Sequence, residues 1–412
     1  MSKLEEMLKY VSEHNDFYKN RIKEYGIKDP LDITQWPVLT RKELQENRYN
    51  MFSDGYISQY YSELLYRRST SGSSGVPIHI YWDHTCYMRS VAHLWRLRKK
   101  YHKITPTSKR VVVTRISEAT TVNPLFVVDR NSLKLSHSFL SNKVKDRDML
   151  KQINEFAPEW MFIQPSKIEE IINLYIENNI SPPKSLIYIE TMGEILLPKI
   201  KEKIEKFFNV PVVNMYGSEE HNGIAYEITP GELQVIKENV FIESMRNGNI
   251  CNKGTGEAII TNLNNMVMPL IRYNQEDIIE LSKESGDNRD ESITNRQIIR
   301  SIKGRKNEIV ELNGFEINSF LLASIVYEVQ NKYNDPIKTY QYCYFKRERR
   351  LCLYIGLSQS YISWKENIFI ALKQAFYSFL GDNPPFCFEI NSIEESTFPY
   401  KTEKFQLMRI VE

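Results

Sequence analysis

The stretch Ser69-Thr70-Ser71-Gly72-Ser73-Ser74-Gly75-Val76-Pro77-Ile78 decides the fold of this chain. Its first seven residues are all small and its two glycines are three positions apart, so the backbone can turn tightly and point its N–H groups at a ligand. The flanking stretches 63–66 and 78–82 predict strands. We therefore expect a hairpin loop that suits a polyphosphate, and the alternative is a flexible serine-glycine linker.

Two common phosphate-binding loops are excluded. The chain contains no Gly-Lys pair, which a Walker loop requires. The run Gly254-Thr255-Gly256 lacks the third glycine of the dinucleotide fingerprint. The serine-rich loop therefore belongs to neither of these folds.

Composition narrows the classes of partner. The chain has 412 residues, with 54 basic and 52 acidic side chains and a net charge of +2, so no basic field would collect nucleic acid or anionic lipid. Five cysteines form no C-x-x-C pair, which indicates free thiols of a cytoplasmic protein. No apolar run approaches the ~18 residues of a membrane span. We expect a small-molecule substrate and neither a nucleic-acid nor a membrane partner.

The order of predicted elements indicates an α/β protein. Strands at 160–164 and 185–189 flank a helix at 167–178, and this βαβ pattern argues for a parallel sheet. Thr40 followed by Glu43 predicts a capping box. The expected architecture is a large domain with mixed or parallel sheets, residues 1–303, and a small mobile α+β domain, residues 304–412.

Four further motifs follow the serine-rich loop. The strand at 210–213 delivers Asn214-Met215-Tyr216-Gly217-Ser218-Glu219-Glu220 at its carboxyl end, where ligands of open α/β sheets bind. The stretch 268–278 reads Met-Pro-Leu-Ile-Arg-Tyr-Asn-Gln-Glu-Asp-Ile and contains Asp277 as its second-last residue. The stretches 302–309 and 398–405 contain Arg305 and Lys404.

Together these motifs resemble the adenylate-forming superfamily, in the same order along the chain. Its patterns are Thr-Ser-Gly-Ser/Thr-Thr-Gly-x-Pro, Tyr-Gly-x-Ser/Thr-Glu, Pro-Leu-Ile-Arg-Tyr-x-x-x-Asp, a Gly-Arg hinge and a terminal lysine. The segment 36–44 is similar to the phenylacetate–CoA ligase and CapK branch. Many relatives in that branch carry cysteines that this chain lacks, so we expect no structural metal.

The resemblance implies ATP and Mg²⁺ as cofactors. It assigns ATP binding to Thr70, Ser71, Gly72, Ser73, Ser74, Gly75, Gly193, Glu194, Met215, Tyr216, Gly217, Asp277 and Arg305, metal binding to Glu220, and catalysis to Lys404, Glu220 and Arg305. In this assignment Tyr216 covers adenine, Asp277 accepts the ribose hydroxyls, and the chain swivels near Gly304.

The chain departs from the family pattern at three places. Glu403 stands where glycine is usual, which leaves Lys401 as a rival for the catalytic lysine. Glu219 is an additional carboxylate in the Tyr-Gly motif. The serine-rich loop lacks the usual lysine, so the charge of the phosphates must be offset by Mg²⁺, by Arg305 and Lys404, or by Arg67 and Arg68.

The implied activity is ATP-dependent adenylation of a carboxylic acid, followed by transfer to a thiol. A narrower similarity to aryl acid–AMP ligases of petrobactin siderophore assembly favours 3,4-dihydroxybenzoate as the acid and an aryl carrier protein as the acceptor. The basic hairpin tip Lys346–Arg350 would meet such a carrier. The alternatives are an acyl-CoA ligase of the phenylacetate type and a non-catalytic nucleotide-binding module.

Overall fold

The computed structural model describes residues 1–69, 78–114, 126–136, 146–284, 296–312, 315–333, 336–381, 384–393 and 407–412. The chain divides into two compact units. The first holds most of residues 1–300, and the second holds Ser301–Glu412 together with the short segment Glu276–Ile279. We retain 303/304 as the proposed boundary between the domains.

Short helices form the amino-terminal part of the first unit. They are α1 (Lys3–His14), α2 (Asp16–Tyr25), the 3-10 turn η1 (Ile33–Gln35), α3 (Arg41–Glu46) and α4 (Tyr56–Tyr61). Thr40 and Glu43 form a reciprocal capping box at the start of α3, which confirms that prediction. The apolar faces of these amino-terminal helices share one core with residues near 263–273, which are far away in the sequence.

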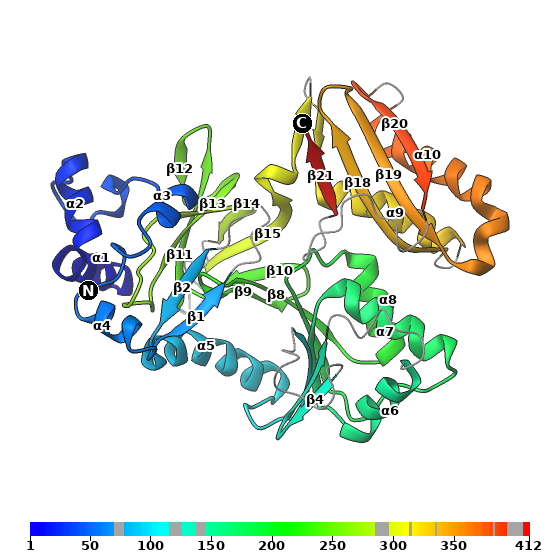
Figure 1. Ribbon diagram of the computed structural model, residues 1–412, viewed down its shortest axis with the longest axis horizontal. Coiled ribbons are helices and arrows are strands. Elements are labelled where there is room, and N and C mark those ends of the chain that lie inside the picture. Colours follow the sequence, from blue (N-terminus) through cyan, green and yellow to red (C-terminus); the bar gives the residue numbers. More distant parts are fainter. Residues whose placement is uncertain are drawn as a thin grey trace. The chain divides into compact units, whose positions relative to one another are not determined.

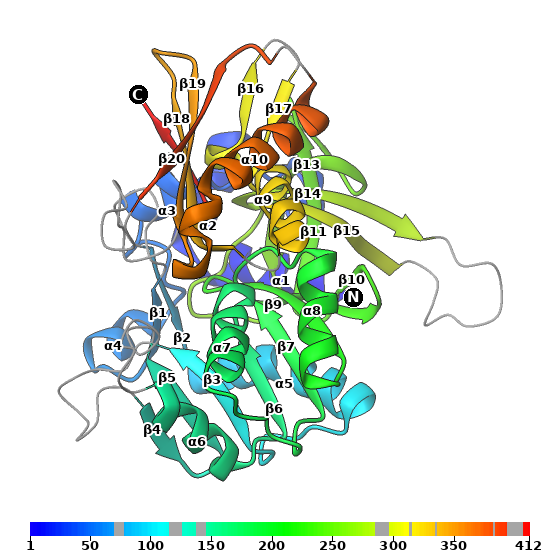
Figure 2. The ribbon, with the colours of Figure 1, turned by 90° about the vertical axis from the view of Figure 1, so that its right-hand side faces the viewer.

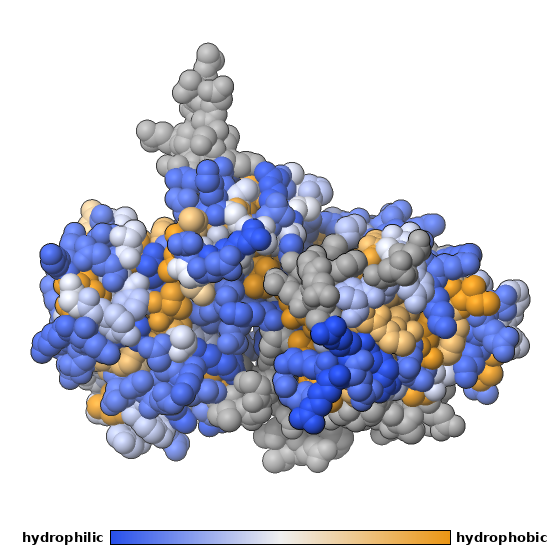
Figure 3. Space-filling model, turned by 90° about the horizontal axis from the view of Figure 1, so that it is seen from above, coloured by the Kyte–Doolittle hydropathy of each residue, from blue (hydrophilic) through white to orange (hydrophobic). Residues whose placement is uncertain are grey.

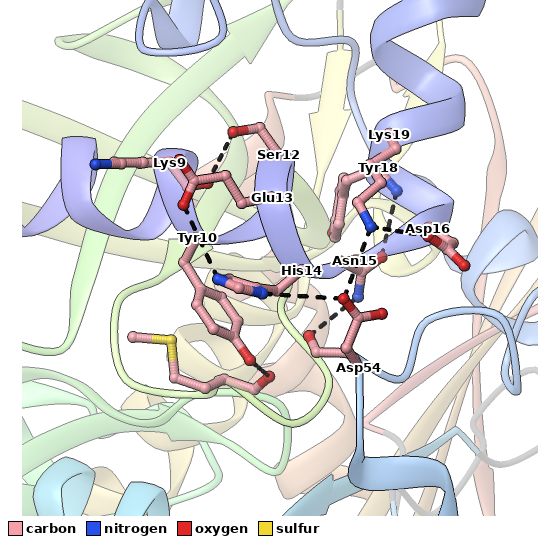
Figure 4. Close-up of polar contacts among 12 residues, drawn as sticks. Lys9, Tyr10, Ser12, Glu13, His14, Asn15, Asp16, Tyr18, Lys19 and Asp54 are labelled. Carbon is pink, nitrogen blue, oxygen red and sulfur yellow. Dashed lines mark hydrogen bonds and ion pairs between the residues drawn. The ribbon is translucent and has the colours of Figure 1, made fainter.

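Polar contacts at the junction of α1 and α2 fasten these helices (Figure 4). The buried Asn15 amide donates to the Met51 carbonyl at 2.9 Å and to Ser53 Oγ at 3.2 Å. The Tyr10 hydroxyl donates to the Met266 carbonyl at 3.2 Å. These bonds satisfy polar groups that would otherwise be buried without partners. The start of the chain is thereby attached to the segment before the Pro-Leu-Ile-Arg-Tyr motif.

A hairpin and a long helix follow. Strands β1 (Tyr66–Ser69) and β2 (His79–Trp82) pair in antiparallel register, as expected for the two sides of the serine-rich loop. Strand β1 begins later than the sequence suggested. The sequence of residues 85–100 predicts a helix, and helix α5 (His84–His102) confirms it.

Within the described residues, the main sheet has thirteen strands in the order β12-β11-β13-β14-β15-β10-β9-β8-β7-β6-β3-β5-β4. Its parallel part consists of β3 (Arg110–Thr114), β5 (Ser132–Ser136), β6 (Trp160–Ile163), β7 (Tyr188–Met192) and β8 (Val212–Ser218). Helices α6 (Asp146–Phe156), α7 (Pro165–Glu177) and α8 (Pro198–Phe208) connect these strands. Figure 2 shows α7 and α8 on one face of the sheet and α5 on the other. The predicted βαβ unit is confirmed.

The remaining strands of this sheet are largely antiparallel. They are β4 (Phe126–Asp129), β9 (Asn222–Thr229), β10 (Glu232–Val235), β11 (Val240–Arg246), β12 (Asn249–Cys251), β13 (Gly254–Asn262), β14 (Tyr273–Glu284) and β15 (Arg296–Arg305). Residues 281–303 are rich in charged and polar side chains, above all at 286–291, and this composition predicts a surface excursion. That expectation is wrong for 281–284 and 296–303, because alternating apolar residues such as Leu281 and Ile299 are buried there as strand positions.

The second unit is an α+β sandwich with its own core (Figure 1). Its four-stranded sheet has the order β20-β19-β18-β21, from β18 (Ile337–Phe345), β19 (Arg350–Leu357), β20 (Cys387–Ser392) and β21 (Met408–Val411). Helices α9 (Ser319–Tyr333) and α10 (Lys365–Leu380), the latter preceded by the 3-10 turn η6 (Gln359–Trp364), pack on it. The pair β16 (Val310–Leu312) and β17 (Phe315–Ile317) precedes α9, after the short turn η5 (Lys306–Glu308). These elements confirm the small α+β domain.

Figure 3 shows one face of the molecule, where hydrophilic residues predominate and hydrophobic ones form smaller patches. Within the described ranges, no helix has both the length and the apolar character needed to cross a bilayer.

Candidate nucleotide-binding site

The serine-rich loop itself, with Thr70, Ser71, Gly72, Ser73, Ser74 and Gly75, lies outside the described residues. Its base is described. Ser69 Oγ lies 2.7 Å from His79 Nδ1 across the hairpin, and Arg68 Nε lies 2.7 Å from Glu219 Oε2. The base of the loop is therefore in contact with the Tyr-Gly motif, which follows about 150 residues later in the sequence.

The Tyr-Gly motif occupies the end of β8 and the turn into β9. Met215 and Tyr216 are buried, and the strand pairing is irregular between Tyr216 and Gly217. A Cβ on Gly217 would lie 2.4 Å from the Asn222 carbonyl oxygen, so only glycine fits this close approach. The sheet changes from parallel to antiparallel pairing at this turn. A turn of this kind at the carboxyl end of a parallel strand is a favourable place for a ligand.

Glu220, the predicted metal ligand, is 3% exposed. Its carbonyl oxygen accepts a hydrogen bond from Asn262 Nδ2 at 3.2 Å, which fixes the turn. Within the described ranges, no group of three or more His, Cys, Asp and Glu side chains is arranged to hold a metal ion. A single carboxylate nevertheless fits Mg²⁺, which proteins commonly hold through one or two carboxylates together with substrate phosphates and water.

A network of buried asparagines supports the same turn. Asn262 Oδ1 accepts from the N–H groups of Asn264 and Asn265, each at 2.9 Å, so its amide nitrogen is the donor toward His221 Nδ1 at 3.4 Å. His221 therefore carries its proton on Nε2, which makes no hydrogen bond with a described residue. Burial lowers the pKa of His221 to about 3, so the imidazole is neutral.

Sequence reasoning missed these asparagines. The signal was available in Thr261-Asn262-Leu263-Asn264-Asn265, because clustered asparagines commonly form side-chain turns with nearby backbone N–H groups. Asn239 extends the network by donating to the carbonyl oxygens of Ser90 and Gly223, both at 2.9 Å. Strands β9, β11 and β13 and helix α5 are thereby joined behind the Tyr-Gly turn.

Gly193 and Glu194 follow β7, next to β8 in the sheet. Gly193 has φ +79°, a conformation that favours glycine. The Glu194 carboxylate accepts from Ser166 N at 3.0 Å and from Ser166 Oγ at 2.9 Å. It thus caps helix α7, whose own N-cap residue Gln164 makes no such bond. Nucleotide binding by Glu194 stays a prediction, and its backbone is the part still available for it.

Asp277 and Arg305 come together within the second unit. Arg305 Nε lies 3.8 Å from Asp277 Oδ1, and the side chains are 33% and 14% exposed, respectively. Gly304 has φ +118°, and a Cβ there would lie 3.5 Å from Ser319 Cβ, so a larger residue would be strained by its backbone rather than by lack of space. The rivals Lys401 and Lys404 lie outside the described residues.

Arg272, the arginine of the Pro-Leu-Ile-Arg-Tyr motif, makes buried hydrogen bonds that the sequence did not predict. Arg272 donates through Nε and Nη2 to both oxygens of Glu243, at 2.8 and 2.6 Å, and through Nη1 to the Trp36 carbonyl at 2.9 Å. Both charged residues are buried. This arginine therefore anchors the amino-terminal segment to β11, just before the strand that carries Asp277.

A second buried pair supports the strand that ends at Gly193. Arg98 of α5 donates through Nε and Nη2 to Glu190 of β7, at 2.9 and 2.6 Å, and the Tyr188 hydroxyl donates to Glu190 at 2.9 Å. Burial opposes the charge on Arg98, but the Glu190 carboxylate more than offsets this effect and raises the pKa of Arg98. The pair was not predicted, because the two residues are 92 positions apart.

Comparison with solved structures defines the class of fold. No family model matches the chain. A 2-hydroxyisobutyryl-CoA ligase in complex with 2-HIB-AMP aligns with a TM-score of 0.76 at 14% identity, over 99% of this chain and 88% of that chain. The GH3.15 acyl acid amido synthetase aligns with a TM-score of 0.61 at 11% identity, over 99% and 90% of the two chains. The chain therefore has the fold of these two enzymes, which confirms the expected fold class.

A sequence relative supports the expected branch. The chain is 27% identical to protein CapK of Staphylococcus aureus over 318 residues, which are 75% of this chain and 68% of CapK. The anthranilate CoA ligase AuaEII in complex with anthranoyl-AMP aligns with a TM-score of 0.55 at 14% identity, over 80% of this chain and 63% of that chain.

Proposed function

We propose that this protein is an ATP-dependent ligase that converts a carboxylic acid to its acyl-adenylate. The observation that carries the proposal is the Tyr216–Glu220 turn at the end of parallel strand β8, in the fold of the adenylate-forming superfamily. Solved proteins with this fold were crystallised with acyl-adenylates, namely 2-HIB-AMP and anthranoyl-AMP. We place the activity in the cytoplasm, where ATP is available.

Each residue has a role that its chemistry suits. Tyr216 would cover the adenine, Asp277 would accept the two ribose hydroxyls, and Glu220 would hold Mg²⁺, which supplies positive charge to the phosphates. Gly193, Met215 and Gly217, together with the backbone of Glu194, would bind the nucleotide by close backbone approach. The loop residues from Thr70 to Gly75 would donate to the β- and γ-phosphates.

The reaction needs positioning and charge stabilisation but no covalent enzyme intermediate. A carboxylate oxygen attacks the α-phosphorus, the bond from that phosphorus to pyrophosphate breaks, and pyrophosphate leaves with its electron pair. Lys404 and Arg305 would stabilise the charge that builds on the α-phosphate. A thiol then attacks the acyl carbon, AMP leaves, and the thiol proton passes to solvent.

We favour an aryl acid such as 3,4-dihydroxybenzoate, with transfer to an aryl carrier protein in petrobactin assembly, on the sequence resemblance. The hairpin tip between β18 and β19 adds little charge attraction for a carrier. Lys346 pairs with Glu412 at 2.5 Å, and Arg350 Nη1 pairs with Glu389 at 2.9 Å, so acidic neighbours offset much of its charge. Coenzyme A is the alternative acceptor, because two structural relatives are CoA ligases.

A two-stage assay tests this function. ATP–pyrophosphate exchange is first measured over a panel of aromatic and aliphatic acids, and we expect exchange with 3,4-dihydroxybenzoate. The adenylate is then offered holo carrier protein, coenzyme A or amino acids, and thioester or amide is measured. Loading of the carrier is the expected result, and release of aryl-CoA would assign the CoA-ligase alternative. No exchange with any acid would leave the non-catalytic nucleotide-binding module.

Lys404→Ala is expected to slow adenylation by roughly 10²–10³-fold, because one preorganised charge at a developing anion contributes about that much. Thiol transfer from a preformed adenylate should change much less, since that step is an attack at the acyl carbon and forms no new bond to the α-phosphorus. Both half-reactions are followed in single turnover. Lys401→Ala is the matched control, and a larger effect of Lys401→Ala on adenylation would make Lys401 the catalytic lysine instead.

A further inference from the structure

A triphosphate that binds at the serine-rich loop, as proposed above, needs a cation close to that loop. The stretch 69–78 contains no basic side chain, whereas ATP and pyrophosphate are strongly anionic. The turn that faces the base of this loop adds two adjacent carboxylates, Glu219 and Glu220. Without a nearby cation these carboxylates would repel the phosphates. Arg67 and Arg68, just before the loop, are the nearest basic residues in the sequence.

The register of the β1–β2 hairpin separates these two arginines. Arg67 lies opposite Tyr81, and Arg68 lies opposite Ile80. Because neighbouring residues of a strand point to opposite faces, Arg67 shares a face with Ser69 and His79, and Arg68 does not. The pKa of His79 agrees with this placement, since it is lowered by burial and also by Arg48 and Arg67. Of the two arginines, Arg68 is the one turned toward the Tyr-Gly motif.

The contact of Arg68 with Glu219 is close and exchangeable. Its Nε lies 2.7 Å from Glu219 Oε2, and the side chains are 39% and 41% exposed. An ion pair this exposed contributes little to stability, so the guanidinium can change partners at small cost. The guanidinium has five N–H donors, and only Nε faces Glu219, so the two terminal nitrogens can donate to a second anion. A planar guanidinium suits bidentate binding of phosphate oxygens.

We propose that Arg68 is the protein cation that binds the β- and γ-phosphates of ATP and the pyrophosphate product, and that Glu219 holds its guanidinium beside the Tyr-Gly turn. This inference rests on the proposed function, because it needs ATP as the ligand. It assigns a purpose to the additional carboxylate of the motif. Glu219 positions Arg68 in the free enzyme, and Arg68 neutralises Glu219 when the phosphates arrive.

Calorimetric titration of ATP, inorganic pyrophosphate and AMP, with Mg²⁺ present, tests the proposal. Arg68→Gln should weaken ATP and pyrophosphate binding by about 10- to 100-fold, the effect of losing hydrogen bonds to a charged group. AMP binding should change by less than about twofold, since AMP lacks the outer phosphates. Arg68→Lys should give an intermediate loss, because it keeps the charge and loses the planar fork.

Arg67→Gln is the matched control, because it removes the same charge from the neighbouring position and the opposite face. It should leave all three affinities within about twofold of wild type, since an exposed charge on the far face is screened by solvent. Equal losses in the Arg67 and Arg68 variants, or an equal loss of AMP binding, would overturn the proposal. If the wild-type protein binds neither ATP nor pyrophosphate, the proposed function itself fails.

Discussion

Glu190→Gln should lower the free energy of unfolding by about 3–5 kcal/mol, the usual cost of removing one partner of a buried ion pair. The Glu190 side chain is 0% exposed and receives three hydrogen bonds, two from Arg98 and one from Tyr188. The glutamine has nearly the same shape, so the loss comes from leaving the Arg98 charge buried without a counter-charge. Urea unfolding, followed by tryptophan fluorescence, measures the effect.

A double-mutant cycle separates the ion pair from simple packing. Arg98→Met should also lower the free energy of unfolding strongly. The double variant should lose little more stability than either single variant, because it leaves no buried charge without its partner. Glu46→Ala is the control for an exposed pair. Glu46 lies 3.7 Å from Lys42 with both side chains more than half exposed, and the loss there should be under about 1 kcal/mol. Strictly additive losses at Arg98 and Glu190 would contradict the ion-pair explanation.

The sequence predicted those parts of the fold that depend on local pattern. The strand-helix-strand order predicted α7, and the Thr40–Glu43 spacing predicted a capping box that the structure contains. Strand β21 was missed because four residues, Met408–Val411, carry too short a pattern. It forms by pairing in parallel with β18, a partner about 65 residues earlier, and no local signal encodes such pairing.

In the candidate site too, the sequence predicted the features that depend on a local motif and missed those that depend on contacts between distant residues. Gly217 was identified from a motif, and the structure gives the physical reason, the close approach of the Asn222 carbonyl. The supporting contacts could not be predicted in this way. Arg272 contacts Glu243, and Asn262 contacts His221, only because the fold brings together residues that are 29 and 41 positions apart in the sequence. In the sequence these are ordinary polar residues. Their burial and their hydrogen bonds in the structure show that they hold the turn and the strands around it.

The Asp277 carboxylate is expected to carry much of the affinity for ATP. A hydrogen bond to a charged group contributes about 1.5–3 kcal/mol, so losing both ribose bonds should cost about 3–6 kcal/mol. Asp277→Ala should therefore weaken ATP binding by about 150- to 20,000-fold. The Asp277 side chain is 14% exposed, and its Oδ1 lies 3.8 Å from Arg305 Nε. Most of the carboxylate is therefore shielded from solvent, and part of it is accessible to a ligand.

A dideoxynucleotide makes this prediction specific for the ribose hydroxyls. Wild-type protein should bind 2′,3′-dideoxy-ATP much more weakly than ATP, whereas Asp277→Ala should bind the two nucleotides about equally, because the acceptor of the hydroxyls is gone. Glu280→Ala, at an exposed position of the same strand, is the control and should discriminate as the wild type does. Calorimetry gives the six affinities, and thermal unfolding checks that both variants are folded. An Asp277→Ala protein that still prefers ATP to the dideoxynucleotide by the wild-type factor would show that another residue holds the ribose.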